Sequence, residues 1–185
     1  MTPTILGVIA DTHIPDRTDT IPKAALDVFS NSQVSAILHA GDLSVLRVKD
    51  LLDEIAPVYA VSGNTDLLLT RHLPPVRYLE FESVSIGLVH GFGGWLRYIW
   101  DKGNYFFYGP RKFSYYENLA RRRVPACRVV VYGHTHVPAN YWIDDQLVFN
   151  PGSPTQPNVT VPALRTSVGL LHLDQGNVRG EIVFV

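Results

Sequence analysis

Side chains that bind metal ions recur at five places in this sequence, each directly after a short apolar run. The clearest case is "VVVYGHTH", where three valines, a tyrosine and a glycine lead to His134 and His136. The same pattern supplies seven candidate ligands in chain order: Asp11, His13, Asp42, Asn64, His90, His134 and His136. A packed core has no use for such side chains at so many run ends. We therefore expect them to form one shared site.

The chemistry of this set indicates a metal centre. Imidazole and carboxylate groups together suit first-row divalent ions. Seven ligands are too many for one tetrahedral ion, but they suit two ions that share a carboxylate. Two ions about 3.5–4 Å apart can stabilise the attacking and leaving oxygens at phosphorus, with a bridging hydroxide as the nucleophile. The set therefore predicts a dinuclear phosphoesterase that works by in-line attack.

An alternative interpretation takes these side chains one at a time. Asp11, Asp42 or Asn64 could each simply cap a helix that follows. A histidine at the end of a strand often only satisfies nearby polar groups. The repetition of the pattern favours the shared site, because independent caps have no reason to follow an apolar run every time.

The elements that must position the ligands alternate between strand and helix in the first third of the chain. Strands that end in polar residues are predicted at 4–11, 34–42 and 58–66. Helices are predicted at 21–31 and 45–56. This alternation implies parallel strands joined by right-handed crossovers.

The second half of the chain is different. It contains further strands at 83–91 and 129–136, then hairpins at 140–153 and 167–185. We therefore predict an α/β fold with mixed sheets, in which parallel units come first and antiparallel hairpins last. The carboxyl ends of parallel strands form the ligand crevice of such sheets, so the seven ligands should meet at one edge.

Composition limits the class of protein. The length of 185 residues predicts a single domain, 1–185, with a real core. A net charge of -1 argues against general nucleic-acid binding, and no apolar run is long enough to span a membrane. The start of the chain has no signal peptide pattern, and the single cysteine, Cys127, excludes a cysteine-based zinc site. We therefore expect a cytoplasmic protein.

The motifs "DTH", "GD", "GN", "HG" and "GHTH", in this order, resemble those of the calcineurin-like metallophosphoesterases. Together with "NPGS" at Asn150–Ser153, they resemble the small bacterial and archaeal phosphodiesterase branch of that superfamily. The resemblance implies a four-layer αββα sandwich. It also implies that Asp42 bridges two metal ions. The first ion would be bound by Asp11, His13 and His136, and the second by Asn64, His90 and His134.

The resemblance further implies manganese as the metal, with zinc, iron, nickel or cobalt as the other options. Asp42, Asn64 and His90 are expected to hold the nucleophile and place the phosphate. Many family members have a histidine directly after the asparagine, whereas this chain has Thr65. Because threonine is no useful general acid near neutral pH, efficient hydrolysis of monoesters with poor leaving groups is not expected. The phosphodiesterase branch that this chain resembles often lacks the histidine as well, which favours a diester substrate.

Two further residues are candidates for supporting the ligands. His39, three residues before Asp42, could hydrogen-bond a ligand, or it could be a strand-end histidine satisfied by the backbone. Asp66 could support the ligands in the same way, or it could be a helix cap or turn residue.

Other functions on the same fold remain open. The stretch "DTHIPDR" also resembles the metallophosphoesterase-like scaffold subunit of retromer, which has lost ligand types at the sites that correspond to Asp42 and Asn64. This chain keeps both residues, so an enzyme acting on a small phosphate ester is favoured over a scaffold. A phosphomonoesterase acting on nucleotides or protein phosphates is the other alternative.

Residues 92–123 form an aromatic and basic elaboration directly after His90, with a helix predicted at 115–123. It could stack on a nucleobase, form a homo-oligomer interface or pack on its own domain. Packing or an interface is favoured over a nucleotide lid, because aromatic side chains commonly serve to bury area.

Overall fold

The fold is taken from a computed structural model, which describes residues 3–66, 73–94, 96–97, 99–100, 103 and 111–185. Part of the predicted 92–123 elaboration lies outside the described residues: positions 95, 98, 101–102 and 104–110. These include the aromatic and basic residues Trp95, Tyr98, Lys102, Tyr105, Phe106, Phe107 and Tyr108. The described part includes helix α4 (Phe113–Arg123), which confirms the helix expected there and begins two residues earlier than predicted.

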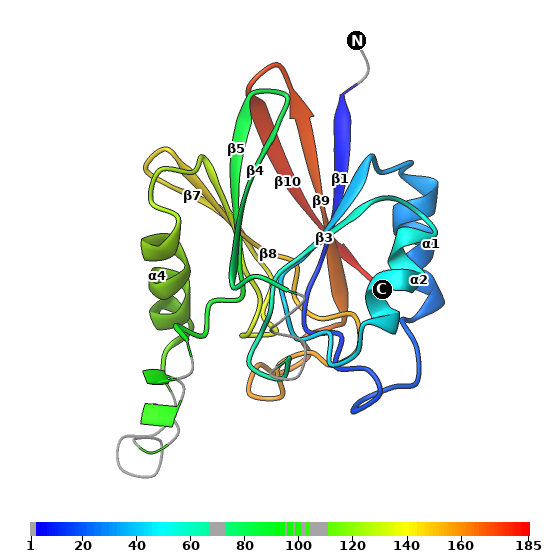
Figure 1. Ribbon diagram of the computed structural model, residues 1–185, viewed down its shortest axis with the longest axis vertical. Helices are drawn as coiled ribbons and strands as arrows, with labels where there is room; N and C mark the ends of the chain where they lie inside the picture. Colours follow the sequence, from blue (N-terminus) through cyan, green and yellow to red (C-terminus); the bar gives the residue numbers. More distant parts are fainter. Residues whose placement is uncertain (1–2, 67–72, 95, 98, 101–102, 104–110) are drawn as a thin grey trace.

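The strands of the described chain form two five-stranded mixed sheets (Figure 1). The order in the first sheet is β10 (Asn177–Phe184), β9 (Ser167–Asp174), β1 (Thr4–Ile9), β2 (Ala36–His39) and β3 (Val58–Ala60). The order in the second sheet is β4 (Val76–Phe81), β5 (Val84–Val89), β6 (Val129–Val131), β8 (Gln146–Asn150) and β7 (Ala139–Ile143).

Strand directions follow the predicted plan. β1, β2 and β3 are mutually parallel, as are β5, β6 and β8. The two predicted hairpins form the antiparallel pairs β7–β8 and β9–β10. The hairpin β4–β5 was not predicted, because β4 is a half-exposed edge strand in which charged residues interrupt the apolar ones.

The two sheets pack face to face, with helices on both outer sides (Figure 1). Helices α1 (Lys23–Asn31) and α2 (Arg47–Asp53) cover the first sheet, and α4 covers the second. Three apolar clusters separate the four layers: one between the sheets, one under α1 and α2, and one under α4. The predicted αββα sandwich is thereby confirmed.

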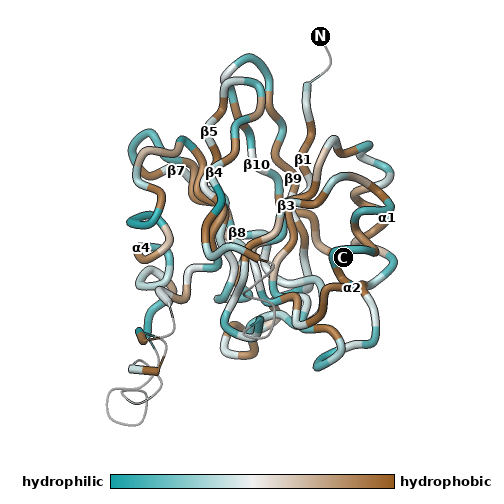
Figure 2. The backbone as a smooth tube through the Cα atoms, viewed as in Figure 1, coloured by the Kyte–Doolittle hydropathy of each residue, from teal (hydrophilic) through white to brown (hydrophobic). Residues whose placement is uncertain are grey.

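Alternation along each strand explains this layering. In β1, Leu6 and Val8 enter the cluster between the sheets, whereas Ile9 packs under the helices. In β6, Val129 faces the other sheet and Val130 faces α4. Strands buried on both faces read as continuous apolar runs, and these appear as hydrophobic segments in Figure 2.

Candidate metal centre

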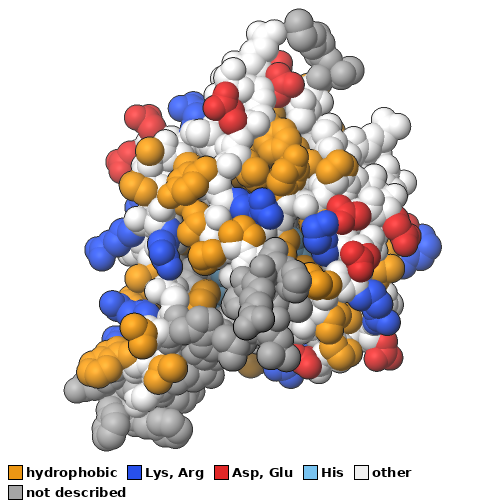
Figure 3. Space-filling view, viewed as in Figure 1, with side chains coloured by type: hydrophobic (Ala, Val, Ile, Leu, Met, Phe, Trp, Pro, Cys, Tyr) orange, Lys and Arg blue, Asp and Glu red, His pale blue; other side chains and the backbone are white. Residues whose placement is uncertain are grey.

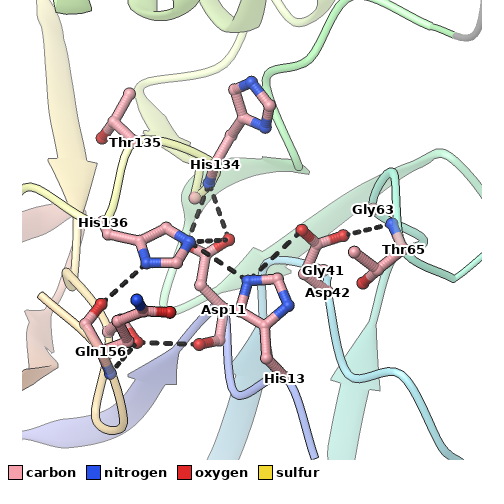
Figure 4. Close-up of polar contacts among 12 residues, drawn as sticks. Asp11, His13, Gly41, Asp42, Gly63, Thr65, His134, Thr135, His136 and Gln156 are labelled. Atoms are coloured by element: carbon pink, nitrogen blue, oxygen red, sulfur yellow. Dashed lines mark hydrogen bonds and ion pairs between the residues drawn. The ribbon is translucent and has the colours of Figure 1, made fainter. Parts of the chain in front are cut away.

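The candidate ligands follow five different strands, at the edge where the parallel strands of both sheets end. Asp11 and His13 follow β1, and Asp42 follows β2. Backbone hydrogen bonds tie these turns together, for example from the amide of Asp11 to the carbonyl of Gly41, at 3.0 Å. The structure brings all seven predicted ligand side chains to this edge, and Figure 4 shows several of them facing one another.

One group of ligand atoms consists of Asp11, His13 and His136, which lie within 4.8 Å of one another. The Nε2 atoms of His13 and His136 are 3.2 Å apart. The Nε2 of His136 is 3.6 Å from Oδ1 of Asp11. This group matches the expected ligands of the first metal.

A second group surrounds Asn64. Its Oδ1 lies 3.0 Å from Nε2 of His90 and 2.8 Å from Nδ1 of His134. The two imidazole nitrogens are 3.3 Å apart. This group matches the expected ligands of the second metal.

Asp42 lies between the two groups. Its Oδ2 is 3.6 Å from Nε2 of His13 and 3.4 Å from Nε2 of His90. The carboxylate therefore faces one imidazole from each group, as a bridging ligand would. Asp11 also approaches the second group, since its Oδ1 is 4.0 Å from Nε2 of His90.

The backbone is strained where the ligands are placed. Five of the seven candidate ligand residues have left-handed φ values: Asp11 (53), His13 (46), Asp42 (58), His134 (69) and His136 (54). Non-glycine residues rarely adopt this conformation, and such outliers cluster at functional sites. The left-handed turns direct these side chains back over the sheet edge.

Hydrogen bonds fix the orientation of the ligand side chains. His90 and His136 donate from Nδ1 to the carbonyls of Ala40 and Gln156, at 2.8 and 2.7 Å. In the neutral imidazoles, Nε2 is therefore the nitrogen with the lone pair, and it faces the centre. Both carboxylates accept hydrogen bonds from backbone amides. Asp11 accepts the amide of His134 at 2.9 Å, and Asp42 accepts the amide of Thr65 at 2.8 Å.

Burial and mutual charge set the ionisation of the site. Burial raises the pKa of Asp11 to about 7, although His90 counteracts part of this. Burial opposes the charge on His90, but Asp42 and Asp11 raise its pKa to about 9. Burial also opposes the charge on Asp42, yet His90 holds its pKa below the usual range. For His13, burial lowers the pKa.

This donor set fits divalent cations. Two carboxylates that are at most 2% exposed lie beside four imidazoles and an amide oxygen. Buried charges in proteins are paired or coordinate metals. Glycine makes the close packing possible: a Cβ at Gly63 would lie 2.1 Å from Oδ1 of Asp42.

Asp66 lies beneath the bridging residue and is fully buried. It accepts three backbone hydrogen bonds, from Asp42 and Gly63 at 2.8 Å and from Ser44 at 2.7 Å. It contacts no ligand side chain in these bonds, but it holds the backbone of two ligand turns. Its effect on the metals remains a prediction.

His39 is also fully buried, and burial lowers its pKa to about 3. Its Nδ1 accepts the amide of Gly41 at 3.2 Å, so Nε2 carries the hydrogen and faces the hydroxyl of Thr12 at 3.3 Å. That hydroxyl donates to the carbonyl of Asp42. His39 thus links the first two ligand turns, through the side chain of Thr12 and the backbone of Gly41. Its effect on metal retention stays a prediction.

Residues of the "NPGS" loop support the centre in a way that sequence reasoning missed. Ser153 donates from Oγ to the carbonyl of Asp11 at 2.8 Å. Asn150 donates from Nδ2 to the carbonyl of Gly133 at 3.0 Å. The motif itself was the available signal, but nothing in it indicated which turns it would contact.

None of the helices in the described part of the chain has the length and apolar character of a membrane span. On the face drawn in Figure 3, acidic and basic side chains are interspersed. This distribution accords with the nearly neutral net charge.

Residues 5–176 match the calcineurin-like phosphoesterase superfamily domain, and the chain belongs to this metal-dependent superfamily. It is 36% identical over 179 residues to a probable metallophosphoesterase of Methanothermobacter thermautotrophicus, and this match covers 97% of this chain and 91% of the relative. It is 26% identical over 150 residues to a phosphodiesterase of Methanocaldococcus jannaschii, and this match covers 80% of this chain and 82% of the relative. These likenesses point to a phosphoesterase hydrolase.

Among solved structures, the chain is similar to Vacuolar Protein Sorting 29 from Cryptosporidium parvum. The TM-score is 0.70 with 20% sequence identity, and the match covers 100% of both chains. At this identity the likeness supports the fold alone. It adds little to the scaffold alternative.

Proposed function

We propose that this protein is a dinuclear metal-dependent phosphodiesterase that acts on small phosphate esters in the cytoplasm. The observation that carries the proposal is the position of Asp42. Its carboxylate faces His13 in one ligand group and His90 in the other, at 3.6 and 3.4 Å. A carboxylate between two complete ligand groups suits a pair of ions better than a single ion.

The positions of the residues support the roles that the family resemblance implies. Asp11, His13 and His136 would hold one ion, and Asn64, His90 and His134 the other. Manganese is the proposed metal, because the family resemblance implies it and because carboxylate and amide oxygens suit it. When bound, such ions lower the pKa of a coordinated water and polarise the phosphate ester.

The residue after Asn64 bears on which esters the centre would hydrolyse. Thr65, where many relatives have a histidine, is exposed, and its hydroxyl lies 3.4 Å from that of Ser44. It offers no proton donor with a useful pKa near neutral pH. Esters whose leaving group departs without protonation are therefore the better substrates.

The test is hydrolysis of bis(p-nitrophenyl) phosphate. The protein is stripped with a chelator and reloaded with manganese, zinc, nickel, cobalt or magnesium in turn. We expect manganese to restore turnover and elemental analysis to find two ions per chain. Rates on p-nitrophenyl phosphate, measured in parallel, separate diesterase from monoesterase activity.

Asp42→Ala should lose turnover and at least one ion, because it removes the shared carboxylate. Asp50→Ala is the matched control, since Asp50 is exposed on α2 and is not one of the candidate ligands. Normal turnover in Asp42→Ala would refute the mechanism. A wild-type chain that binds no metal and hydrolyses neither ester would favour the scaffold.

A further inference from the structure

A mainly apolar pocket adjoins the metal centre. Its cavity measures ≈ 230 Å³. The wall includes the end of β5, the loop after it, the segment before β4 and one face of α4. Its lining includes Leu73, Val89, His90, Phe92, Leu119 and Arg123. Because His90 belongs to both the pocket and the second ligand group, a group bound at the metals lies next to this pocket.

Helix α4 connects the pocket to the ligands through one of its faces. Tyr116, Leu119 and Arg123 are spaced by three and four residues, so they share that face. The ring of Tyr116 packs edge-on against the imidazole of His134, with centroids 4.6 Å apart. Leu119 and Arg123, further along, line the pocket. The helix therefore runs from the metal centre along the pocket wall.

The loop after β5 forms the facing wall, directly against α4. A Cβ at Gly93 would lie 3.0 Å from Cδ1 of Leu119. A Cβ at Gly94 would lie 3.7 Å from Nη2 of Arg123, and its φ of +96 favours glycine. Glycine at these two positions allows the loop to approach α4 this closely, and neither position adds a side chain to the pocket.

Arg123 brings a cation to the edge of this apolar space. Within the described residues, no carboxylate pairs with its guanidinium, whereas Arg121 on the same helix faces Asp144 at 3.9 Å. The backbone of Arg123 is fixed by the hydroxyl of Tyr78, which donates to its carbonyl at 3.0 Å. A guanidinium so placed suits an acceptor oxygen on a bound group.

We propose that this pocket binds one organic substituent of the phosphate ester: a flat, mainly apolar ring with an acceptor oxygen that reaches Arg123. The proposal rests on the proposed function, because the phosphate at the metal centre fixes where the substituent lies. The volume of ≈ 230 Å³ is below the range of about 300–1,000 Å³ typical of ligand pockets. It therefore suits one ring rather than a whole larger ligand.

The kinetic test compares two diesters with the same leaving group. These are bis(p-nitrophenyl) phosphate, which offers a second ring, and methyl p-nitrophenyl phosphate, which does not. The ratio of their kcat/KM values is measured for the manganese-loaded wild type and for three variants. Leu119→Trp fills the pocket, Arg123→Met removes the guanidinium, and Arg122→Met is the matched control on the exposed side of the helix.

We expect Leu119→Trp and Arg123→Met each to lower the ratio about tenfold, equivalent to about 1.4 kcal/mol. The ratio should stay unchanged in Arg122→Met. Intrinsic reactivity of the two esters cancels, because each variant is compared with the wild type. Metal content should remain that of the wild type, since none of these residues is a ligand. A wild-type ratio retained in both pocket variants would overturn the proposal.

A binding measurement separates this proposal from the proposed function. Calorimetry with phenylphosphonate and methylphosphonate should show tighter binding of the ring compound to the loaded wild type, and Leu119→Trp should abolish that difference. If the ring preference is found but no ester is hydrolysed with any metal, the pocket stands and the phosphodiesterase proposal fails. If hydrolysis is metal-dependent but no ring preference appears in rate or binding, the function stands and the pocket proposal fails.

Discussion

The buried carboxylate of Asp66 provides a sharp test of how the metal centre is supported. Its Oδ2 accepts the amides of Asp42 and Gly63, and its Oδ1 accepts that of Ser44. In Asp66→Asn, the amide oxygen can retain the first two bonds only. The new NH₂ group then faces the amide of Ser44, so two donors meet in a buried space.

The expected magnitude follows from these three bonds. A hydrogen bond to a charged group contributes about 1.5–3 kcal/mol, and a buried unsatisfied donor costs about 1–3 kcal/mol. Losing one bond and weakening two should therefore lower the free energy of unfolding by about 3 kcal/mol. For a domain of this size, that corresponds to a fall in Tm of about 6–12 °C. Manganese affinity should fall about 10–100-fold, as for other residues that support metal ligands.

The assay is thermal unfolding of the metal-free protein, together with calorimetric titration of manganese. Asp50→Asn is the control, since the same change on the exposed face of α2 should alter stability by no more than about 0.5 kcal/mol. If Asp66→Asn melts like this control and binds manganese like the wild type, then Asp66 does not support the ligand turns. A loss of stability with unchanged metal affinity would make Asp66 a turn residue only.

Three other predictions concern the same edge of the sheets. Gly63→Ala should lose metal binding, because the new Cβ would lie only 2.1 Å from Oδ1 of Asp42. Metal analysis checks this. Gly103→Ala is the control, since a Cβ at Gly103 would meet nothing within 4 Å. His39→Ala should weaken manganese retention during dialysis by loosening the turn of Asp42, and unchanged retention would make His39 a purely structural residue. Manganese binding at pH 8 should release protons, because His90, with a pKa of about 9, is protonated in the metal-free protein. Manganese affinity should therefore rise with pH up to about 9. Calorimetry in buffers of different ionisation enthalpy measures the proton release.

The edge of the fold that carries the ligands could be predicted from sequence because two signals coincide there. Runs such as 4–11 and 34–42 are buried on both faces and read clearly as strands, and each ends in a polar side chain. Parallel strands end at one edge, so the ligands had to meet. The edge strand β4 was missed, since a half-exposed strand lacks the continuous apolar run.

The contacts that hold the ligands in place could not be predicted. Ser153 and Asp11 are 142 residues apart in the chain, and no local sequence pattern predicts a hydrogen bond between residues so far apart in sequence. The left-handed φ values of His134 and His136 could not be predicted either, because the sequence suggests that the strand simply continues through "GHTH". These features depend on how both sheets pack, which periodicity does not determine.

The form of the centre bears on the choice between enzyme and scaffold. The carboxylates of Asp11 and Asp42 are buried together, and their residues, like those of His13 and His136, have left-handed φ values. Such backbone conformations cost about 1–3 kcal/mol each, and buried charges cost more unless they are compensated. Divalent cations bound by the same atoms would offset these costs, and for this reason we favour an enzyme over a scaffold that binds no metal. Local rules broken together at one edge are what a functional metal site requires.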